Sequence, residues 1–171
     1  MFEKFGEFDS CEELNRAAAA QLAEGDEEAI LMLAEENGID REDAEDYIDG
    51  CVPELATPLM AALGKLELEK KDLKIDGILD DWFSCAVELC RTEEDMAAAV
   101  RRKGKCLQDC MAALLRYAFE NKKQVSDKII QATRVTHNGK EEAMRGPVYL
   151  GVPSQAETKR IVREYYLGDQ A

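Results

Sequence analysis

The segment KCLQDCMAALLRYAFEN, residues 105–121, carries the strongest helical pattern of the chain. Its apolar residues recur every three or four positions, which is the repeat of an α-helix that packs by one face. The predicted inner face holds Cys106, Cys110, Ala113, Leu114 and Tyr117. The predicted outer face holds Asp109, Ala112, Arg116 and Glu120. This pattern indicates a helix that is packed against others in a mainly α-helical fold.

Residues that favour helix N-termini predict further helices on both sides of this segment. They are Ser10, Asp40, Thr57, Thr92 and Ser154, and two of them, Ser10 and Ser154, are followed three positions later by Glu, the pattern of a capping box. Between residues 133 and 150 an Asn-Gly pair and β-favouring residues predict a small β-hairpin or an irregular segment. We therefore expect a mainly α fold, a multi-helix bundle with this one exception.

Charge is divided unevenly along the chain. The 171 residues carry a net charge of -14, with 36 acidic and 22 basic residues. Residues 1–50 hold 17 acidic and 3 basic residues, residues 51–100 hold 11 and 5, and residues 101–171 hold 8 and 14. We therefore expect an acidic N-terminal helical subdomain (1–50), a set of central helices (51–100) and a basic C-terminal helical region (101–171).

Seven acidic residues of the first subdomain form the predicted partner-binding surface. They are Asp26, Glu27, Glu28, Glu42, Glu45, Asp46 and Asp49. The last four share one face of a helix, because they are spaced at i, i+3, i+4 and i+7. Like charges at i and i+4 destabilise a helix by about 0.2–0.5 kcal/mol per pair. Two interpretations follow, a merely solvated face or a face kept for a basic partner.

A second candidate surface is basic and belongs to the C-terminal region. It comprises Arg101, Arg102, Lys103, Lys105, Lys159, Arg160 and Arg163. These residues either contact nucleic acid or neutralise the acidic half of the same or a second molecule. The sequence pI of about 4.6 and the lack of a recognised nucleic-acid-binding motif favour neutralisation.

The residues that would carry chemistry do not form a recognisable catalytic or metal site. Cys106 and Cys110 are spaced at i and i+4, which suits zinc only with two further ligands, and His137 is the single histidine. The chain lacks a phosphate-binding glycine loop, a dinucleotide fingerprint and a nucleophile elbow. We expect a binding protein and not an enzyme, with no catalytic residue, metal or cofactor.

The N-terminus and the cysteines bear on the compartment. The opening MFEKFGEFDS is acidic and does not fit a secretory signal, and no apolar run approaches the roughly 18 residues of a membrane span. Without an export signal, the six cysteines are expected to be reduced thiols. We expect a cytoplasmic bacterial protein that does not contact a membrane.

Three segments resemble proteins of mobile genetic elements. KGKCLQDCMAALLRYAFENK (103–122) and AETKRIVREYYLGD (156–169) resemble PcfK-like proteins of conjugative elements in Firmicutes, over about the last 70 residues. MFEKFGEFDSCEELNRAAAAQLAEGDEEAI (1–30) is similar to proteins of such elements that are grouped as type II-A anti-CRISPRs. The chain departs from the PcfK-like pattern at Cys106, where a small polar residue is expected.

The resemblance implies a protein that binds and inhibits the type II-A Cas9 nuclease. Cas9 holds nucleic acid in a positively charged channel and reads its PAM with arginines, so acidic helices could act there as a DNA mimic. The predicted partner is Cas9 or its guide-RNA complex. The alternative is a conjugation accessory protein that binds DNA or a transfer protein through the basic C-terminal half, and a homo-oligomer also stays open.

Overall fold

Residues 4–168 are described by a computed structural model, in which nine helices and four short strands occur. The helices are α1 (Cys11–Glu24), α2 (Glu27–Glu36), α3 (Arg41–Ile48), α4 (Pro58–Leu73), α5 (Ile78–Thr92), α6 (Glu94–Arg101), α7 (Leu107–Glu120), α8 (Asp127–Ala132) and α9 (Gln155–Leu167). The strands are β1 (Lys123–Gln124), β2 (Arg134–His137), β3 (Lys140–Ala143) and β4 (Tyr149–Leu150). The predicted mainly helical bundle with a small hairpin is confirmed.

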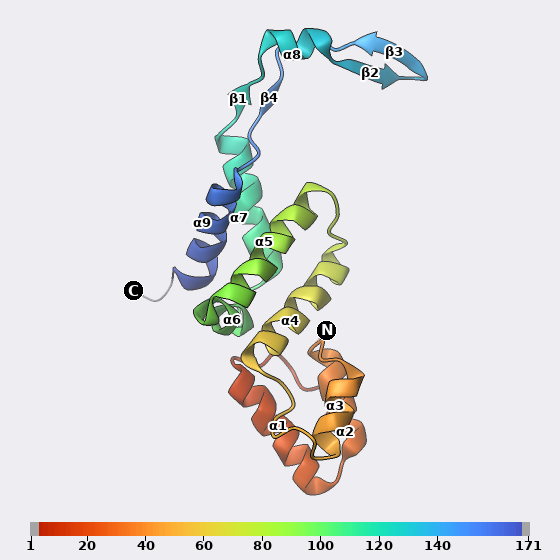
Figure 1. Ribbon diagram of the computed structural model, residues 1–171, viewed down its shortest axis with the longest axis vertical. Coiled ribbons are helices and arrows are strands. Elements are labelled where there is room, and N and C mark those ends of the chain that lie inside the picture. The colour runs from red at the N-terminus through yellow and green to blue at the C-terminus, as the bar shows by residue number, and fades with distance from the viewer. Residues whose placement is uncertain (1–3, 169–171) are drawn as a thin grey trace.

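The elements form three parts that follow one another along an elongated molecule (Figure 1). Helices α1–α3 lie at one end and are called the acidic unit. Helices α4–α7 and α9 form the middle, called the body. Residues 122–150, with α8 and all four strands, extend from the other end as the arm.

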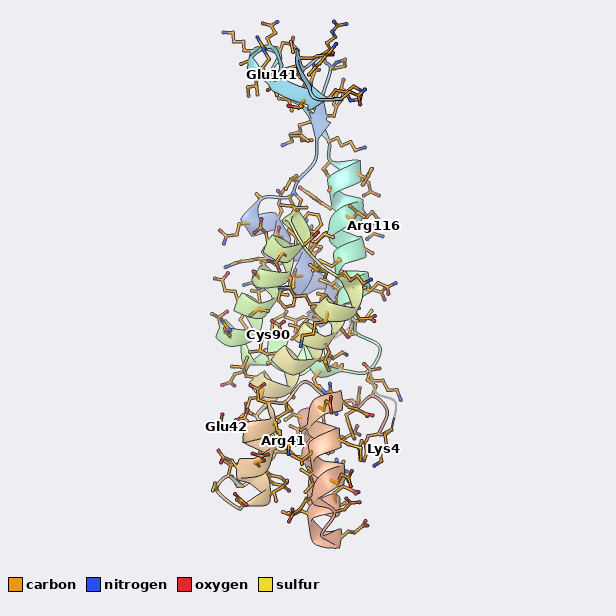
Figure 2. All side chains as sticks on the ribbon, turned by 90° about the vertical axis from the view of Figure 1, so that its right-hand side faces the viewer. Lys4, Arg41, Glu42, Cys90, Arg116 and Glu141 are labelled. Carbon is orange, nitrogen blue, oxygen red and sulfur yellow. The ribbon has the colours of Figure 1, made fainter. Side chains whose placement is uncertain are left out.

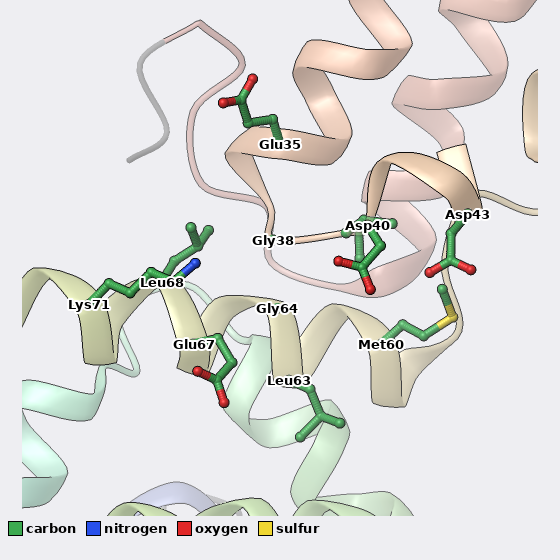
Figure 3. A pocket seen from close by; sticks show the side chains of 11 residues that line it. Glu35, Gly38, Asp40, Asp43, Met60, Leu63, Gly64, Glu67, Leu68 and Lys71 are labelled. Atoms are coloured by element: carbon green, nitrogen blue, oxygen red, sulfur yellow. The ribbon is translucent and has the colours of Figure 1, made fainter. Parts of the chain in front are cut away.

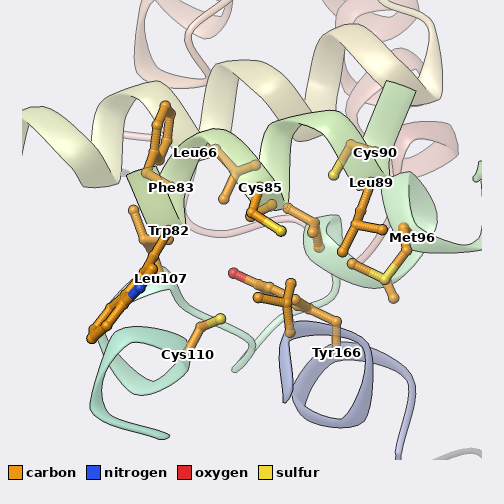
Figure 4. Packing of buried hydrophobic residues seen from close by; sticks show 14 of the residues in the cluster. Leu66, Trp82, Phe83, Cys85, Leu89, Cys90, Met96, Leu107, Cys110 and Tyr166 are labelled. Atoms are coloured by element: carbon orange, nitrogen blue, oxygen red, sulfur yellow. The ribbon is translucent and has the colours of Figure 1, made fainter. Parts of the chain in front are cut away.

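Two separate hydrophobic cores stabilise the acidic unit and the body. The first core gathers α1–α3 around Leu14, Ile30, Leu33 and Tyr47, and it includes Ala61 at the start of α4. The second core begins one residue later and is centred on Leu66, Trp82, Leu89, Leu114 and Tyr166 (Figure 4). Helix α4 therefore belongs to both cores, and the residues of the predicted central segment 51–100 are shared between them.

Helix α7, from the segment 105–121, packs as its pattern predicts, with one exception at its start. Cys110 and Leu114 are fully buried, and Arg116 is exposed. Cys106 is not on the inner face of the helix, because it is the extended N-cap residue of α7, with φ -134°, and is half-buried. Its position at the cap explains why the thiol does not align with the helical repeat.

Most predicted helix starts are confirmed, and one is wrong. The side chains of Ser10, Thr57 and Ser154 accept backbone N–H bonds at the starts of α1, α4 and α9. Thr92, in contrast, is the last residue of α5, and its hydroxyl donates to the Glu88 carbonyl at 2.9 Å. Threonine can bond back to the carbonyl four residues earlier in a helix, so the same side chain can end one helix instead of starting the next.

The arm consists of two small antiparallel strand pairs with α8 between them. Strand β1 pairs with β4, and β2 pairs with β3. The β2–β3 turn is Asn138-Gly139, both with positive φ, as a two-residue hairpin loop requires. Every residue of these two strands is exposed, so the hairpin gains little stability from packing on the body.

Candidate functional site

The connection between α2 and α3 crosses α4 at two glycines. A Cβ on Gly64 would lie 2.4 Å from the Asn37 carbonyl oxygen, and a Cβ on Gly38 would lie 2.4 Å from the Gly64 carbonyl oxygen. Gly38 also has φ +69°, which disfavours other residues. The two glycines thus let one backbone rest directly on the other, and a groove lies along this crossing.

The groove has a volume of about 570 Å³ and an acidic lining. Glu35, Asp40, Asp43 and Glu67 contribute carboxylates, whereas Lys71 is its single cation. Figure 3 shows these side chains around the Gly38–Gly64 crossing. Between them lie the apolar side chains of Ile39, Met60, Leu63 and Leu68.

A second hollow of about 480 Å³ shares Glu35, Ile39 and Asp40 with the first. It adds the carboxylate of Glu28 and the guanidinium of Arg41. The two hollows together are called the acidic groove, with five carboxylates, two cations and an apolar floor. Such a lining suits the side chains of Lys and Arg, whose aliphatic stems favour apolar surface while their heads favour carboxylates.

The seven acidic residues predicted from the sequence are all exposed, but the structure gives them different surroundings. Asp26 caps α2 by accepting the Ala29 N–H at 2.9 Å. Glu45 pairs with Arg41 at 2.7 Å, and Glu28 lines the groove. The remaining four lie on the outer surface of α2 and α3, and Figure 2 shows Glu42 there beside Arg41.

The sequence did not identify most of the groove. The sequence predicts Asp40 only as a helix cap, and the structure shows no capping bond from its side chain. Glu67 is far from Asp43 in sequence and joins it only because α4 packs under the α2–α3 connection. The closest sequence signal was the Asn37-Gly38 pair, which predicts a turn but not what the turn contacts.

Arg101 does not belong to an exposed basic patch, because its side chain is only 1% exposed. Its Nη2 donates to the Asn37 Oδ1 at 2.6 Å, where the acidic unit meets the body. Lys105, which precedes α7, is half-buried, and its Nζ donates to the carbonyl of Tyr165 in α9 at 2.8 Å. The Lys103 N–H donates to the Asp9 carboxylate at 3.0 Å. The side chains of Arg101 and Lys105 thus make contacts within the chain, whereas the side chain of Lys103 is exposed.

The basic residues of α9 bind carboxylates of the same chain. Lys159 pairs with Glu88 of α5 at 3.0 Å, and Arg160 pairs with Glu164 one turn away. The Arg163 guanidinium binds the carboxylate of Glu93, which is the N-cap residue of α6. The hydrogen bond from Arg163 lowers the pKa of Glu93. These three cations are therefore paired within the chain, but with glutamates outside residues 1–50, so the α9 contacts do not neutralise the acidic half.

A buried network centred on Lys65 of α4 connects the segment before α1 to the body. The Lys65 ammonium donates to the Glu7 carboxylate at 2.8 Å and to the carbonyls of Arg102 and Lys105 at 3.2 and 2.6 Å. Glu69, one turn along α4, accepts the Leu107 N–H at 2.8 Å. Burial raises the pKa of Glu69, although that N–H and the Lys65 charge oppose the shift. These groups stabilise the junction of the parts and are too enclosed to bind a ligand.

Thiols and carboxylates do not gather into a metal site in the part of the chain that the structure describes: it contains no group of three or more histidine, cysteine, aspartate or glutamate residues placed to hold an ion. The six cysteines are free, and burial raises the pKa of Cys90 and of Cys110 to about 12. Within residues 4–168, every helix is too short or too polar to cross a membrane.

Comparisons with known proteins returned no match to a protein family, a curated protein or a solved structure. The similarity to PcfK-like proteins and to type II-A anti-CRISPRs stays a prediction from the sequence.

Proposed function

We propose that this chain is a binding protein whose acidic unit docks on a basic, nucleic-acid-binding surface of another protein. The observation that supports the proposal is the acidic groove, in which Glu28, Glu35, Asp40, Asp43 and Glu67 surround an apolar floor. Carboxylates that face solvent repel nucleic acid and attract basic protein surfaces.

The outer face of α3 extends this surface beyond the groove. Glu42, Asp46 and Asp49 are exposed there, and Figure 2 shows Glu42 on the acidic unit, in the half of the molecule away from the arm. A partner that binds phosphates with Lys and Arg would meet these carboxylates in place of phosphates. The chain therefore acts by occupying the partner's nucleic-acid site as a DNA mimic, not by catalysis.

The specific partner that we propose is Cas9 of type II-A CRISPR systems, alone or with its guide RNA. This choice rests on the resemblance of residues 1–30 to anti-CRISPR proteins. Cas9 offers the required surface, since it holds the heteroduplex in a positive channel and reads the PAM through arginines. Bound at either place, the acidic unit inhibits DNA binding.

A role as a conjugation accessory protein that binds DNA through its basic residues has less support. Arg101 is buried, and Lys159, Arg160 and Arg163 each pair with a glutamate of the same chain. A phosphate backbone would have to displace those glutamates. These four basic residues therefore do not offer one common cationic surface to DNA.

The test measures binding of the protein to purified Cas9–guide complex and its effect on target cleavage at several salt concentrations. The variant Asp40→Lys/Asp43→Lys reverses two groove charges, and the N-cap residue Asp40 makes no capping bond from its side chain. We expect at least about tenfold weaker binding and inhibition, because charge complementarity between the two surfaces becomes repulsion. Wild-type binding should weaken as salt rises.

The matched control is Asp72→Lys/Asp76→Lys, which makes the same charge change on two exposed residues, one in the last turn of α4 and one in the connection to α5. It should inhibit like the wild type. Equal loss in both variants would mean that net charge alone matters and would contradict a groove-specific site. No binding of the wild type to Cas9 would remove Cas9 as the partner, and capture of another basic nucleic-acid-binding protein would then identify the surface that the groove fits.

A further inference from the structure

We infer that two copies of this chain form a closed two-fold dimer, in which the arm of each copy binds the acidic groove of the other. The inference goes beyond the proposed function and does not depend on it, because both surfaces belong to the chain itself. It rests on the charge, the exposure and the placement of the arm.

The arm is basic although the chain as a whole is acidic. Residues 122–150 contain six basic and three acidic residues. The basic side chains are all exposed: Lys122, Lys123, Lys128, Arg134, Lys140 and Arg145. The acidic groove has five carboxylates and two cations. The two surfaces therefore have opposite net charge.

Apolar groups on the arm are exposed to a degree that suggests a partner. The side chain of Ile129 on α8 is 59% exposed, and Val135 on β2 is 38% exposed. An isolated two-stranded hairpin such as β2–β3 is marginally stable in water, so contact with a second surface would stabilise it. The apolar floor of the groove, with Met60, Leu63 and Leu68, offers such a surface.

The arm cannot reach the groove of its own chain, because the body separates them. Both views place the arm and the acidic unit at opposite ends of the molecule (Figures 1 and 2). Two copies that lie antiparallel bring each arm beside the acidic unit of the other copy. The two contacts are then equivalent by symmetry, which closes the assembly at a dimer and avoids an open chain.

The charge pattern of the hairpin favours a protein surface over nucleic acid as the occupant. Glu141 and Glu142 on β3 lie among the basic residues of the arm, and phosphates would repel them. The groove contains cations as well as carboxylates, Arg41 and Lys71, which can face these glutamates. The arm, which is mainly basic with a few acidic residues, thus meets a groove on the second copy that is mainly acidic with a few basic residues.

Dimer formation would cover the same groove that we propose for the basic partner. A partner must then displace the arm, so binding should weaken as the concentration of dimer rises. The two proposals can be tested independently. Dimer formation is measured with the pure protein, and partner binding is measured at concentrations where the chain is monomeric.

The test is analytical ultracentrifugation of the full chain over a range of protein concentrations, at about 0.1 M and about 1 M salt, where the Debye length falls from about 10 Å to about 3 Å. We expect a monomer–dimer equilibrium whose dissociation constant rises at least about tenfold at high salt, because association depends on exposed charges. A monomer at all concentrations, or an open series of larger oligomers, would overturn the inference.

A charge-swap experiment identifies the surfaces. The arm variant Lys128→Glu/Arg145→Glu and the groove variant Asp40→Lys/Asp43→Lys should each be monomeric when alone, because both contacts of each dimer are then repulsive. An equimolar mixture should form a one-to-one dimer, since both contacts become attractive again. Dimers of either variant alone, or no dimer in the mixture, would show that these surfaces are not the interface.

Matched controls carry the same charge changes elsewhere. Arg91→Glu/Arg116→Glu and Asp72→Lys/Asp76→Lys alter exposed residues of the body and should dimerise like the wild type. A gel-shift titration with duplex DNA tests whether the arm binds nucleic acid instead of a second copy. If the wild-type chain is monomeric and the arm variant alone loses DNA binding, the arm is a nucleic-acid contact and the dimer is wrong.

Discussion

Lys65 shows how a single side chain holds two cores together. It is 1% exposed, and its ammonium lies between Glu7 of the N-terminal segment and the carbonyls of Arg102 and Lys105 in the body. A buried charge without partners is costly, so the network is favourable only while all its members are present.

Lys65→Met should therefore destabilise the protein by about 3 kcal/mol, the lower part of the range for breaking a buried ion pair. The loss leaves the buried carboxylate of Glu69 and two carbonyls without the ammonium. Urea unfolding at pH 7 measures this loss in the free energy of unfolding. Lys71→Met, an exposed lysine of the same helix, is the control and should change stability by less than about 0.5 kcal/mol. Similar values for both variants would contradict the structural role of Lys65.

Gly64 allows the backbone crossing that shapes the groove. In a helix interior Ala is normally more stable than Gly by about 1 kcal/mol, so propensity alone favours Gly64→Ala. The added Cβ would instead meet the Asn37 carbonyl oxygen at 2.4 Å, and this contact is with backbone that cannot rotate away.

We expect Gly64→Ala to destabilise the protein by about 3 kcal/mol, as overpacking against a rigid neighbour does. The control is Gly25→Ala, where φ is +73° but no atom lies within 4 Å of the added Cβ, so only the backbone strain of about 1 kcal/mol applies. Thermal unfolding followed by circular dichroism compares the two. If Gly64→Ala is neutral or stabilising, the crossing is not as close as described.

At the scale of elements, the start of α9 is tied to α7 through Glu157. Its carboxylate accepts the Ser154 N–H at 2.9 Å and the Ser154 hydroxyl at 2.8 Å, and the Tyr117 hydroxyl of α7 donates to it as well. These donors lower the pKa of Glu157 to about 2, with the Tyr117 bond as the main cause. A capping box predicted from sequence thus also serves as a contact between two helices.

The lowered pKa predicts how stability depends on pH. Because the folded protein holds Glu157 ionised, its contribution is complete above the ordinary value of 4.5 and is lost as pH falls towards about 2. The melting temperature of Glu157→Gln should be below that of the wild type at pH 7, and the difference should shrink between pH 4.5 and 2. Glu120→Gln, on the exposed side of α7, should show no such change. A difference that stays constant with pH would contradict the assignment.

At the scale of the molecule, stability should decrease from the two cores to the arm. Helices α5 and α7 contribute many buried residues to the second core, whereas Ile130 is the buried residue of α8 and the β2–β3 hairpin contributes none. Amides exchange with solvent through local opening, so few buried contacts mean fast exchange.

We expect the amides of residues 134–143 to exchange at least about a hundredfold faster than those of α5 in dilute protein, because the hairpin lacks packing partners. Hydrogen–deuterium exchange with mass spectrometry measures this directly. Protection of the hairpin equal to that of α5, at concentrations where the chain is monomeric, would mean that the arm packs on the body and is not extended.

The sequence alone determined which segments are helical, where most of them start and where the hairpin turns, because periodicity, caps and the Asn-Gly pair act over a few residues. It also showed that the N-terminal part is acidic and exposed. Only the tertiary structure decided which side chains meet: Arg101 contacts Asn37 in the buried junction, Asp43 and Glu67 line the same groove, and two α9 cations bind Glu88 of α5 and Glu93 between α5 and α6. These contacts join residues far apart in the chain, and hydrogen bonds and charge interactions depend on distance in space, which no local pattern encodes.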